Sequence, residues 1–363
     1  MADFKWFSKW NRENPKNIFG PAYVVGAVGG AVVIAALLVT WGYPPSYEAV
    51  QTGPRGTGME VVKFAGEREQ VDPGAPAFYT EPAIVPTGGE TLARDVYENV
   101  PVLGDLTEDN FNRLMVAITD WVSPEQGCAY CHGEEGNFAA DDLYTKVVSR
   151  RMIEMTRNIN ETWTDHVSPA GVTCFTCHRG QNVPTGIWFD IAPVVNSMAG
   201  WGAVQNRVTS LSQSTSLPSD ALQKYLVEYE PIRVHDLEPR VDNEGTATVQ
   251  DAERTFSLMN YMSNSLGVNC TYCHNTRALH DLEQATPQLS TAQLGIGMAL
   301  ELNNDYLLPL GASLPENRLG TVNGDAPKVA CATCHKGLAK PLQGLNVIAD
   351  WPELRQSGTP VYE

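Results

Sequence analysis

Apolar residues recur every three or four positions in four segments of the chain, which is the period of an amphipathic helix. The predicted helices span residues 107–122, 140–161, 250–266 and 290–306. Each carries methionine on its apolar face: Met115, then Met152 and Met155, then Met259 and Met262, and last Met298. The pattern predicts a mainly α-helical fold in which one helical unit recurs.

A fifth apolar segment is continuous instead of periodic. Residues 22–41 contain no charged side chain, and a helix of about 20 residues spans roughly 30 Å, the thickness of a bilayer core. The first basic residue after this segment is Arg55, whereas four precede it: Lys5, Lys9, Arg12 and Lys16. The positive-inside rule therefore predicts one transmembrane helix with a cytoplasmic N-terminus. A cleaved signal peptide is the alternative, but the segment is long for one and no small-x-small cleavage site follows it.

Proline and glycine separate these elements. Residues 42–106 are predicted to form an extended, irregular arm with at most short strands. A second irregular stretch, residues 190–249, connects two helical halves and has a short helix predicted near 218–229. The predicted order is cytoplasmic N-terminus, transmembrane helix, arm, first helical half, connector, second helical half and C-terminal tail, at residues 1–21, 22–41, 42–106, 107–189, 190–249, 250–345 and 346–363.

The haem assignment comes from the cysteines, all eight of which lie in Cys-x-x-Cys-His pentads. The four pentads are Cys128, Cys131 and His132; Cys174, Cys177 and His178; Cys270, Cys273 and His274; and Cys331, Cys334 and His335. This spacing is typical of c-type haem attachment, in which two thiols bond the vinyl groups and the imidazole binds iron. One pentad would also fit a redox motif or half of a zinc site. Four pentads with no spare cysteine predict four covalently bound haems, the first haem pair at residues 107–189 and the second at residues 250–345.

The histidines are too few to complete four iron sites. The chain has seven histidines, and only His166, His235 and His280 lie outside the pentads. At least one iron must therefore take another ligand or keep an open position. Methionine is the usual second ligand in electron-transfer cytochromes, so the helices before the first three pentads supply the candidates. Periodicity does not choose within the pairs Met152/Met155 and Met259/Met262, because residues three apart share a helix face.

The net charge of the chain limits the classes of macromolecule that it can bind. The net charge is −17 and the pI is about 4.8, which makes nucleic acid an improbable partner and a basic protein a plausible one. Four carboxylates follow the first pentad closely: Glu134, Glu135, Asp141 and Asp142. They predict an acidic face beside the first haem, which is either simply solvated or steers a basic soluble donor.

With these features the chain resembles the tetrahaem cytochrome c subunit of the purple-type photosynthetic reaction centre. The resemblance covers roughly residues 45–345 and rests on the spacing of the four pentads, the methionine-bearing helices and a histidine shortly before the second pentad. In that family three haems have His/Met ligation and one has His/His ligation.

The resemblance implies a distal ligand for each iron. It assigns Met115 to the first haem, Met152 to the second and Met259 to the third. His166 then reaches across to the fourth haem, opposite His335. Met298 is expected to be a core residue, although it occupies the repeat position. Many members of the family carry a lipid on an N-terminal cysteine, whereas this chain has no cysteine before Cys128 and is expected to keep its helix, as some members do.

The function implied by the resemblance is electron transfer, not enzyme catalysis. The subunit re-reduces the photo-oxidised bacteriochlorophyll pair through a roughly linear chain of haems, with the third haem nearest the pair and the first far from it. The implied partners are the core subunits that bind bacteriochlorophyll, the surrounding light-harvesting antenna, and a small soluble cytochrome c or high-potential iron–sulfur protein as donor. The implied location is the bacterial inner membrane, with the haem domain in the periplasm.

A membrane-anchored tetrahaem quinol dehydrogenase is the alternative. It too has one N-terminal helix and four pentads. It is usually much shorter and richer in histidine, however, so three spare histidines in a chain of 363 residues argue against it.

Overall fold

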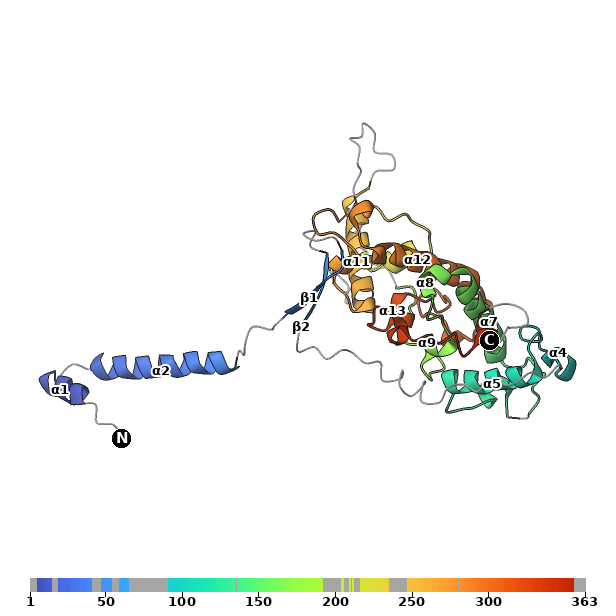
Figure 1. The fold of residues 1–363 in the computed structure, drawn as a ribbon, viewed down its shortest axis with the longest axis horizontal. Helices are drawn as coiled ribbons and strands as arrows, with labels where there is room; N and C mark the ends of the chain where they lie inside the picture. Colours follow the sequence, from blue (N-terminus) through green and yellow to red (C-terminus); the bar gives the residue numbers. More distant parts are fainter. Residues whose placement is uncertain are drawn as a thin grey trace, which may run out of the picture. The chain divides into compact units, whose positions relative to one another are not determined.

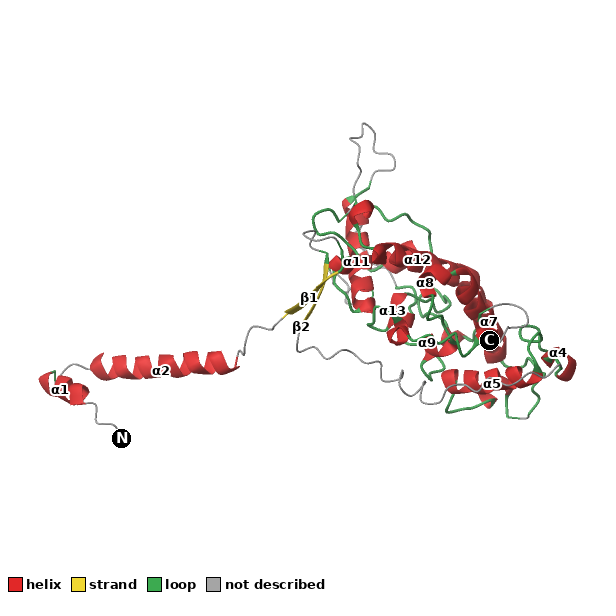
Figure 2. Ribbon diagram, viewed as in Figure 1, coloured by secondary structure: helices red, strands yellow, loops and turns green. Residues whose placement is uncertain are grey.

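The computed structural model describes residues 5–14, 19–40, 47–53, 59–64, 91–134, 136–191, 204–205, 209, 211, 216–234, 247–279 and 281–355. The chain divides into two compact units, residues 1–50 with 62–69 and residues 51–61 with 70–363. Helices greatly outnumber strands in the described part of the chain, as Figures 1 and 2 show. The prediction of a mainly α-helical protein is therefore confirmed.

Two helices make up most of the smaller unit, α1 (Lys5–Glu13) and α2 (Phe19–Thr40). Within α2, residues Ala22–Val39 have a mean hydropathy of 2.4, and none of this stretch is buried in the protein. Pro21 lies in the first turn of α2, where a missing backbone N–H is tolerated. The helix is thus long and apolar enough to cross a bilayer, as predicted for residues 22–41.

The arm contributes a two-stranded sheet, β1 (Tyr47–Gln51) paired with β2 (Glu60–Phe64), drawn yellow in Figure 2. This agrees with the prediction of at most short strands. The Thr271 hydroxyl donates a hydrogen bond to the carbonyl of Glu60, and the Thr52 hydroxyl donates to the carbonyl of Thr271 at 3.5 Å. The arm therefore touches the third pentad. Its residues 65–90 lie outside the described part of the chain.

The larger unit is built from long helices and short helical turns. Its α-helices are α4 (Ala93–Val96), α5 (Glu108–Val122), α6 (Ala129–His132), α7 (Tyr144–Thr162), α8 (Thr164–Val167), α9 (Cys174–His178), α10 (Ala221–Leu226), α11 (Val249–Leu266), α12 (Pro287–Glu301) and α13 (Cys331–His335). The 3-10 turns are η2 (Cys270–Tyr272), η3 (Leu282–Gln284), η5 (Leu308–Ala312), η6 (Glu316–Arg318), η7 (Pro341–Gly344) and η8 (Pro352–Leu354). A π-helical turn, Leu302–Leu307, continues α12.

The four predicted long helices exist, and two of them differ in extent for identifiable reasons. The helix predicted from residue 140 begins at Tyr144, because the Lys146 ammonium binds the carbonyls of Phe138 and Ala140 at 2.7 Å and holds them outside the helix. The α-helical part of the last one ends at Glu301. In the π-turn that follows, the buried Asn303 side chain donates to the carbonyl of Leu226 at 3.0 Å and accepts from the N–H of Val329 at 2.8 Å.

The end of the described chain packs into the core of the larger unit. Trp351 is 7% exposed and lies edge-on to Trp121, with ring centroids 4.7 Å apart. The Arg113 guanidinium stacks 4.1 Å above Trp351 and pairs with the fully buried carboxylate of Glu353. Asn160 of α7 donates to the carbonyl of Leu354 at 2.8 Å. The segment predicted as a C-terminal tail is therefore, up to residue 355, a structural part of the larger unit.

Candidate functional site

Each pentad forms one short helical turn that follows a longer helix. Within such a turn the two cysteines, three residues apart, lie on the same side and the histidine follows directly. Side-chain hydroxyls fix two of the turns. Thr176 accepts a hydrogen bond from the backbone of Thr173 at 3.0 Å, and Thr333 accepts one from the backbone of Ala330 at 3.1 Å. Thr333 also donates to the carbonyl of Gly186 at 2.9 Å.

The histidines of all four pentads are oriented in the same way. Each places Nδ1 on a backbone carbonyl: His132 on Phe138 at 3.3 Å, His178 on Gln181 at 2.8 Å, His274 on Leu279 at 2.9 Å and His335 on Leu338 at 2.9 Å. The same holds for His166, whose Nδ1 lies 2.9 Å from the carbonyl of Thr291. A carbonyl on Nδ1 selects the tautomer whose Nε2 carries a free lone pair, which is the arrangement of a metal-binding imidazole.

Burial favours the uncharged form of His132, His166, His178 and His335. It lowers the pKa of His132, His166 and His178, and lowers the pKa of His335 to about 4. A neutral imidazole is the form that binds a metal. Burial also raises the pKa of the Cys174 thiol to about 12, which disfavours the thiolate that zinc requires. Among the described residues no three histidine, cysteine or acidic side chains converge on a metal position.

A large cavity runs through the larger unit and fits a bulky apolar group. Its volume is about 1190 Å³, above the roughly 300–1,000 Å³ of ordinary ligand pockets. Protein interiors otherwise leave few voids larger than a water molecule. The cavity is lined by cysteines and histidines of the first, second and fourth pentads: Cys128, Cys131, His132, Cys174, Cys177, His178, Cys331, Cys334 and His335. The residues present therefore fit covalently bound haem.

The predicted distal ligands lie on this cavity with one exception. Met115 of α5 and Met152 of α7 both line it. Met155 lines it too, but is buried in a cluster with Ile159. On α11 only one of the two methionines lines the cavity, and it is Met262 instead of Met259. The cavity therefore does not decide between Met259 and Met262, and the choice of Met259 stays a prediction.

His166 lies close to the histidine of the fourth pentad. The ring centroids of His166 and His335 are 6.2 Å apart. Two imidazoles on opposite sides of one iron have centroids about 6.3 Å apart, given metal–nitrogen bonds of roughly 2.0 Å. The two rings thus have the separation that a shared iron would require.

The repeats follow a spatial order that differs from their order in the sequence. α5, the helix before the first pentad, packs on α9, the second pentad. α9 in turn contacts α13, the fourth pentad, and the Sγ atoms of Cys177 and Cys334 are 3.1 Å apart. α13 packs on α11, the helix before the third pentad. In Figure 1, α9 and α13 accordingly lie between α5 and α11.

The predicted acidic face is smaller than the sequence suggested. Asp141 binds the Arg150 guanidinium at 2.9 Å, the Lys146 ammonium at 3.2 Å and the Asn99 amide at 3.0 Å. These contacts hold the pKa of Asp141 well below its usual range and neutralise its charge locally. Glu134 and Asp142 are exposed, and their role in docking a donor stays a prediction. Three residues considered from the sequence, Glu135, His235 and His280, lie outside the described part of the chain.

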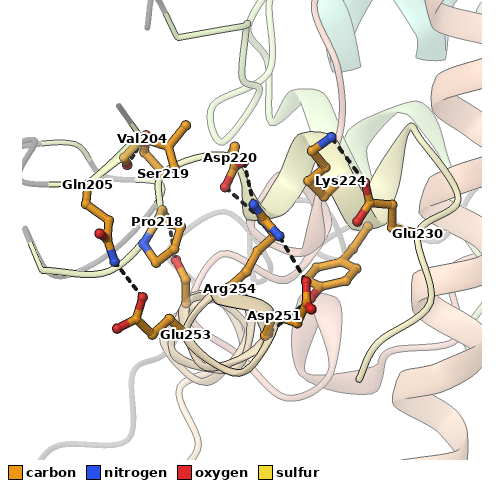
Figure 3. Close-up of polar contacts among 12 residues, drawn as sticks. Val204, Gln205, Pro218, Ser219, Asp220, Lys224, Glu230, Asp251, Glu253 and Arg254 are labelled. Atoms are coloured by element: carbon orange, nitrogen blue, oxygen red, sulfur yellow. Dashed lines mark hydrogen bonds and ion pairs between the residues drawn. The ribbon is translucent and has the colours of Figure 1, made fainter. Parts of the chain in front are cut away.

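A polar network around α11 was not expected from the sequence. The Arg254 guanidinium binds both oxygens of Asp220, at 3.1 and 3.2 Å, and lies 3.3 Å from Asp251 (Figure 3). Gln205 of the connector donates to Glu253 at 2.6 Å. These bonds fasten the connector to the helix that carries Met259 and Met262. No sequence pattern marked the contacts with the connector, because Asp220 and Gln205 lie more than thirty residues from their partners on α11.

Comparison with known proteins places the chain among close relatives. Residues 43–355 match the family described as photosynthetic reaction centre cytochrome C subunit. A photosynthetic reaction center cytochrome c subunit of Roseobacter denitrificans is 59% identical over 99% of this chain and 99% of its own length. Proteins of the same description from Rubrivivax gelatinosus and Thermochromatium tepidum are each 43% identical, over 90% and 89% of this chain and 88% and 79% of their own lengths.

Proposed function

Because this chain belongs to the family of photosynthetic reaction centre cytochrome c subunits, we propose that it re-reduces the photo-oxidised bacteriochlorophyll pair through four covalently bound haems. Members of this family are electron carriers, so the chain is an electron-carrier subunit of a membrane complex and not an enzyme. The quinol dehydrogenase alternative is not favoured by these matches. The observation that carries the number four is the shared orientation of the four pentad histidines, each with Nδ1 on a carbonyl.

The role of the protein is to hold the haems, to orient them and to set their reduction potentials. When bound, c-type haem supplies reversible one-electron redox chemistry. The eight cysteines would anchor it, and His132, His178, His274 and His335 would present Nε2 to the iron. We assign the remaining positions to Met115, Met152, Met259 and His166. The cavity lining supports Met115 and Met152, and the 6.2 Å ring separation supports His166 opposite His335.

The packing order supports a linear path that runs from the first site through the second and the fourth to the third. The third pentad stands at one end of this order, and the arm residues Thr52 and Glu60, which follow the membrane helix in the sequence, contact its Thr271. We therefore place the third site nearest the bacteriochlorophyll pair. The first site is then the entry point for a small soluble cytochrome c or a high-potential iron–sulfur protein, with the exposed Glu134 and Asp142 beside it.

Four haems should be detectable by mass. The mature chain, denatured and analysed by mass spectrometry, is expected to carry four haem additions, since thioether bonds survive unfolding. Replacing Cys331 and Cys334 together with alanine should remove one addition and leave three. Three or fewer additions on fully matured wild-type chain would contradict the proposal.

The topology is expected to follow the charge asymmetry around α2. We propose that the N-terminus is cytoplasmic and the haem-bearing unit periplasmic, in the bacterial inner membrane. Protease added to spheroplasts should then digest the haem-bearing unit and spare an N-terminal tag, and inside-out vesicles should give the opposite result. A tag that is cleaved in spheroplasts while the haem-bearing unit survives would contradict this orientation.

A further inference from the structure

The long helices before the pentads share a short sequence pattern. Two of them carry a pair of methionines three residues apart, Met152 and Met155 on α7 and Met259 and Met262 on α11. In each pair the first methionine is the proposed iron ligand. The helix before the fourth pentad, α12, has Gly295 and Met298 with the same spacing. Aligned by these pairs, Met298 matches the second methionine and Gly295 stands at the ligand position.

The methionines of α7 and α12 share one core cluster, which does not by itself choose between the two alignments. Met155, the second methionine of its pair, is buried in a cluster with Ile159 and Leu302. Met298 packs against the same cluster, but so does Met152, and both are partly buried and line the cavity. That Met298 is a core residue stays a prediction. Aligned by the methionine pairs, the ligand position of the repeat falls on Gly295. The fourth helix has no side chain where the others are proposed to bind iron.

The space left at Gly295 is filled by His166. A β-carbon added at Gly295 would lie 2.7 Å from Cε1 and 3.2 Å from Nε2 of His166, closer than the roughly 3.5–4.0 Å at which carbon atoms pack. The ring is held in this position from two directions. Its Nδ1 lies 2.9 Å from the carbonyl of Thr291, one turn earlier on α12, and its backbone N–H donates to the carbonyl of Trp163 at 2.9 Å.

The docking of α8 on α12 (Figure 1) does not depend on this ring alone. The Trp163 indole donates to Glu301 at 3.2 Å, and Asn158 donates to the other oxygen of the same carboxylate at 2.5 Å. Gly297 lies under the Trp163 ring, where an added β-carbon would be 3.1 Å away. A side chain at position 295 should consequently move the His166 ring while α8 stays attached. Alanine and methionine are better helix formers than glycine, so α12 should persist.

We propose that Gly295 is a positioning residue that selects His/His ligation at the fourth haem, by leaving the ligand position of the repeat empty for His166. The inference rests on the ligand set proposed above. A methionine at position 295 would restore the arrangement of the other three repeats, displace the ring and offer its thioether to the iron. Thioether ligation raises the reduction potential.

The test compares Gly295→Met and Gly295→Ala with wild type, each as the full haem-loaded chain. Redox titration and electron paramagnetic resonance report the potential and axial ligands of each haem. In Gly295→Met the bis-imidazole signal should disappear and a fourth His/Met haem appear, with the redox equilibrium of that haem shifted at least about a hundredfold, or about 120 mV for one electron. Gly295→Ala should weaken the bis-imidazole signal without adding a thioether signal. Met298→Leu, the matched control, should leave both readouts unchanged.

Two results overturn the inference in distinguishable ways. A wild-type chain without a bis-imidazole haem would refute the proposed ligand set itself. A wild-type bis-imidazole signal that persists unchanged in both Gly295 variants would leave that ligand set standing and show that Gly295 does not select it.

Discussion

Replacement of Met259 by leucine is expected to lower the potential of the third haem by at least about 59 mV, a tenfold change in its redox equilibrium. The reason is that a thioether ligand raises the potential of haem iron and leucine offers no ligand atom. At an ambient potential between the wild-type and variant values, the third haem of the variant is oxidised before the flash. The fast re-reduction of the bacteriochlorophyll pair should then be lost, and it should return when the ambient potential is lowered.

Met262→Leu provides the matched control, because it removes the same thioether three residues along the same helix. It is expected to leave the potential and the fast phase near their wild-type values, at the cost of a small packing defect against the neighbouring core. The opposite outcome, with Met262→Leu lowering the potential and Met259→Leu not, would reassign the ligand within the pair. That result would fit the finding that Met262, not Met259, lines the large cavity.

Replacement of Glu353 by glutamine is expected to destabilise the haem-bearing unit by about 3–5 kcal/mol, the usual effect of breaking a buried ion pair. Glu353 is fully buried, and its carboxylate is paired with Arg113. The backbone carbonyl of Glu353 also accepts a hydrogen bond from the buried Arg157 at 2.9 Å. The turn η8 is thus held to α5 through Arg113 and to α7 through Arg157. Without the carboxylate, the Arg113 charge remains largely buried and unneutralised.

Thermal unfolding of the haem-loaded chain, followed by circular dichroism, measures this effect. The midpoint should fall by roughly 5–10 °C for a loss of this size in a chain of this length. Glu283→Gln, at an exposed position, is the matched control and should shift the midpoint by less than about 1 °C. An unchanged midpoint in Glu353→Gln would show that the ion pair between η8 and α5 does not stabilise the haem-bearing unit.

Local features were predictable from the sequence because they depend on short-range pattern. The period of apolar residues located α5, α7 and α11 to within a few residues, and the cysteine spacing located the pentads. The pattern before the fourth pentad was predicted less well. There the helix becomes a π-turn around Asn303, whose partners Leu226 and Val329 lie far away in the sequence. The period of apolar residues within one segment carries no information about contacts with such distant residues.

Features that depend on tertiary contact were not predictable from pattern. The adjacency of the second and fourth pentads follows from tertiary contacts between α9 and α13, among them the contact between Cys177 and Cys334. Similarly, counting charges near His132 predicted an acidic face, whereas the fold brings Arg150 and Lys146 onto Asp141. The choice of His166 came from the family resemblance, and the close approach of its ring to Gly295, on which the proposed positioning role rests, becomes visible only when α12 and α8 are packed together.

Flash spectroscopy of the intact reaction centre complex with this subunit bound tests the central claim most directly. With the haems reduced beforehand, a single flash should be followed by recovery of the bacteriochlorophyll pair and, at the same rate, by oxidation of a haem of this chain. If the haems of this chain reduce the pair, both signals share one rate constant, and removal of the subunit abolishes the fast recovery. Recovery of the bacteriochlorophyll pair only by charge recombination with the reduced quinone, while the haem absorbance stays constant, would contradict electron transfer from this chain.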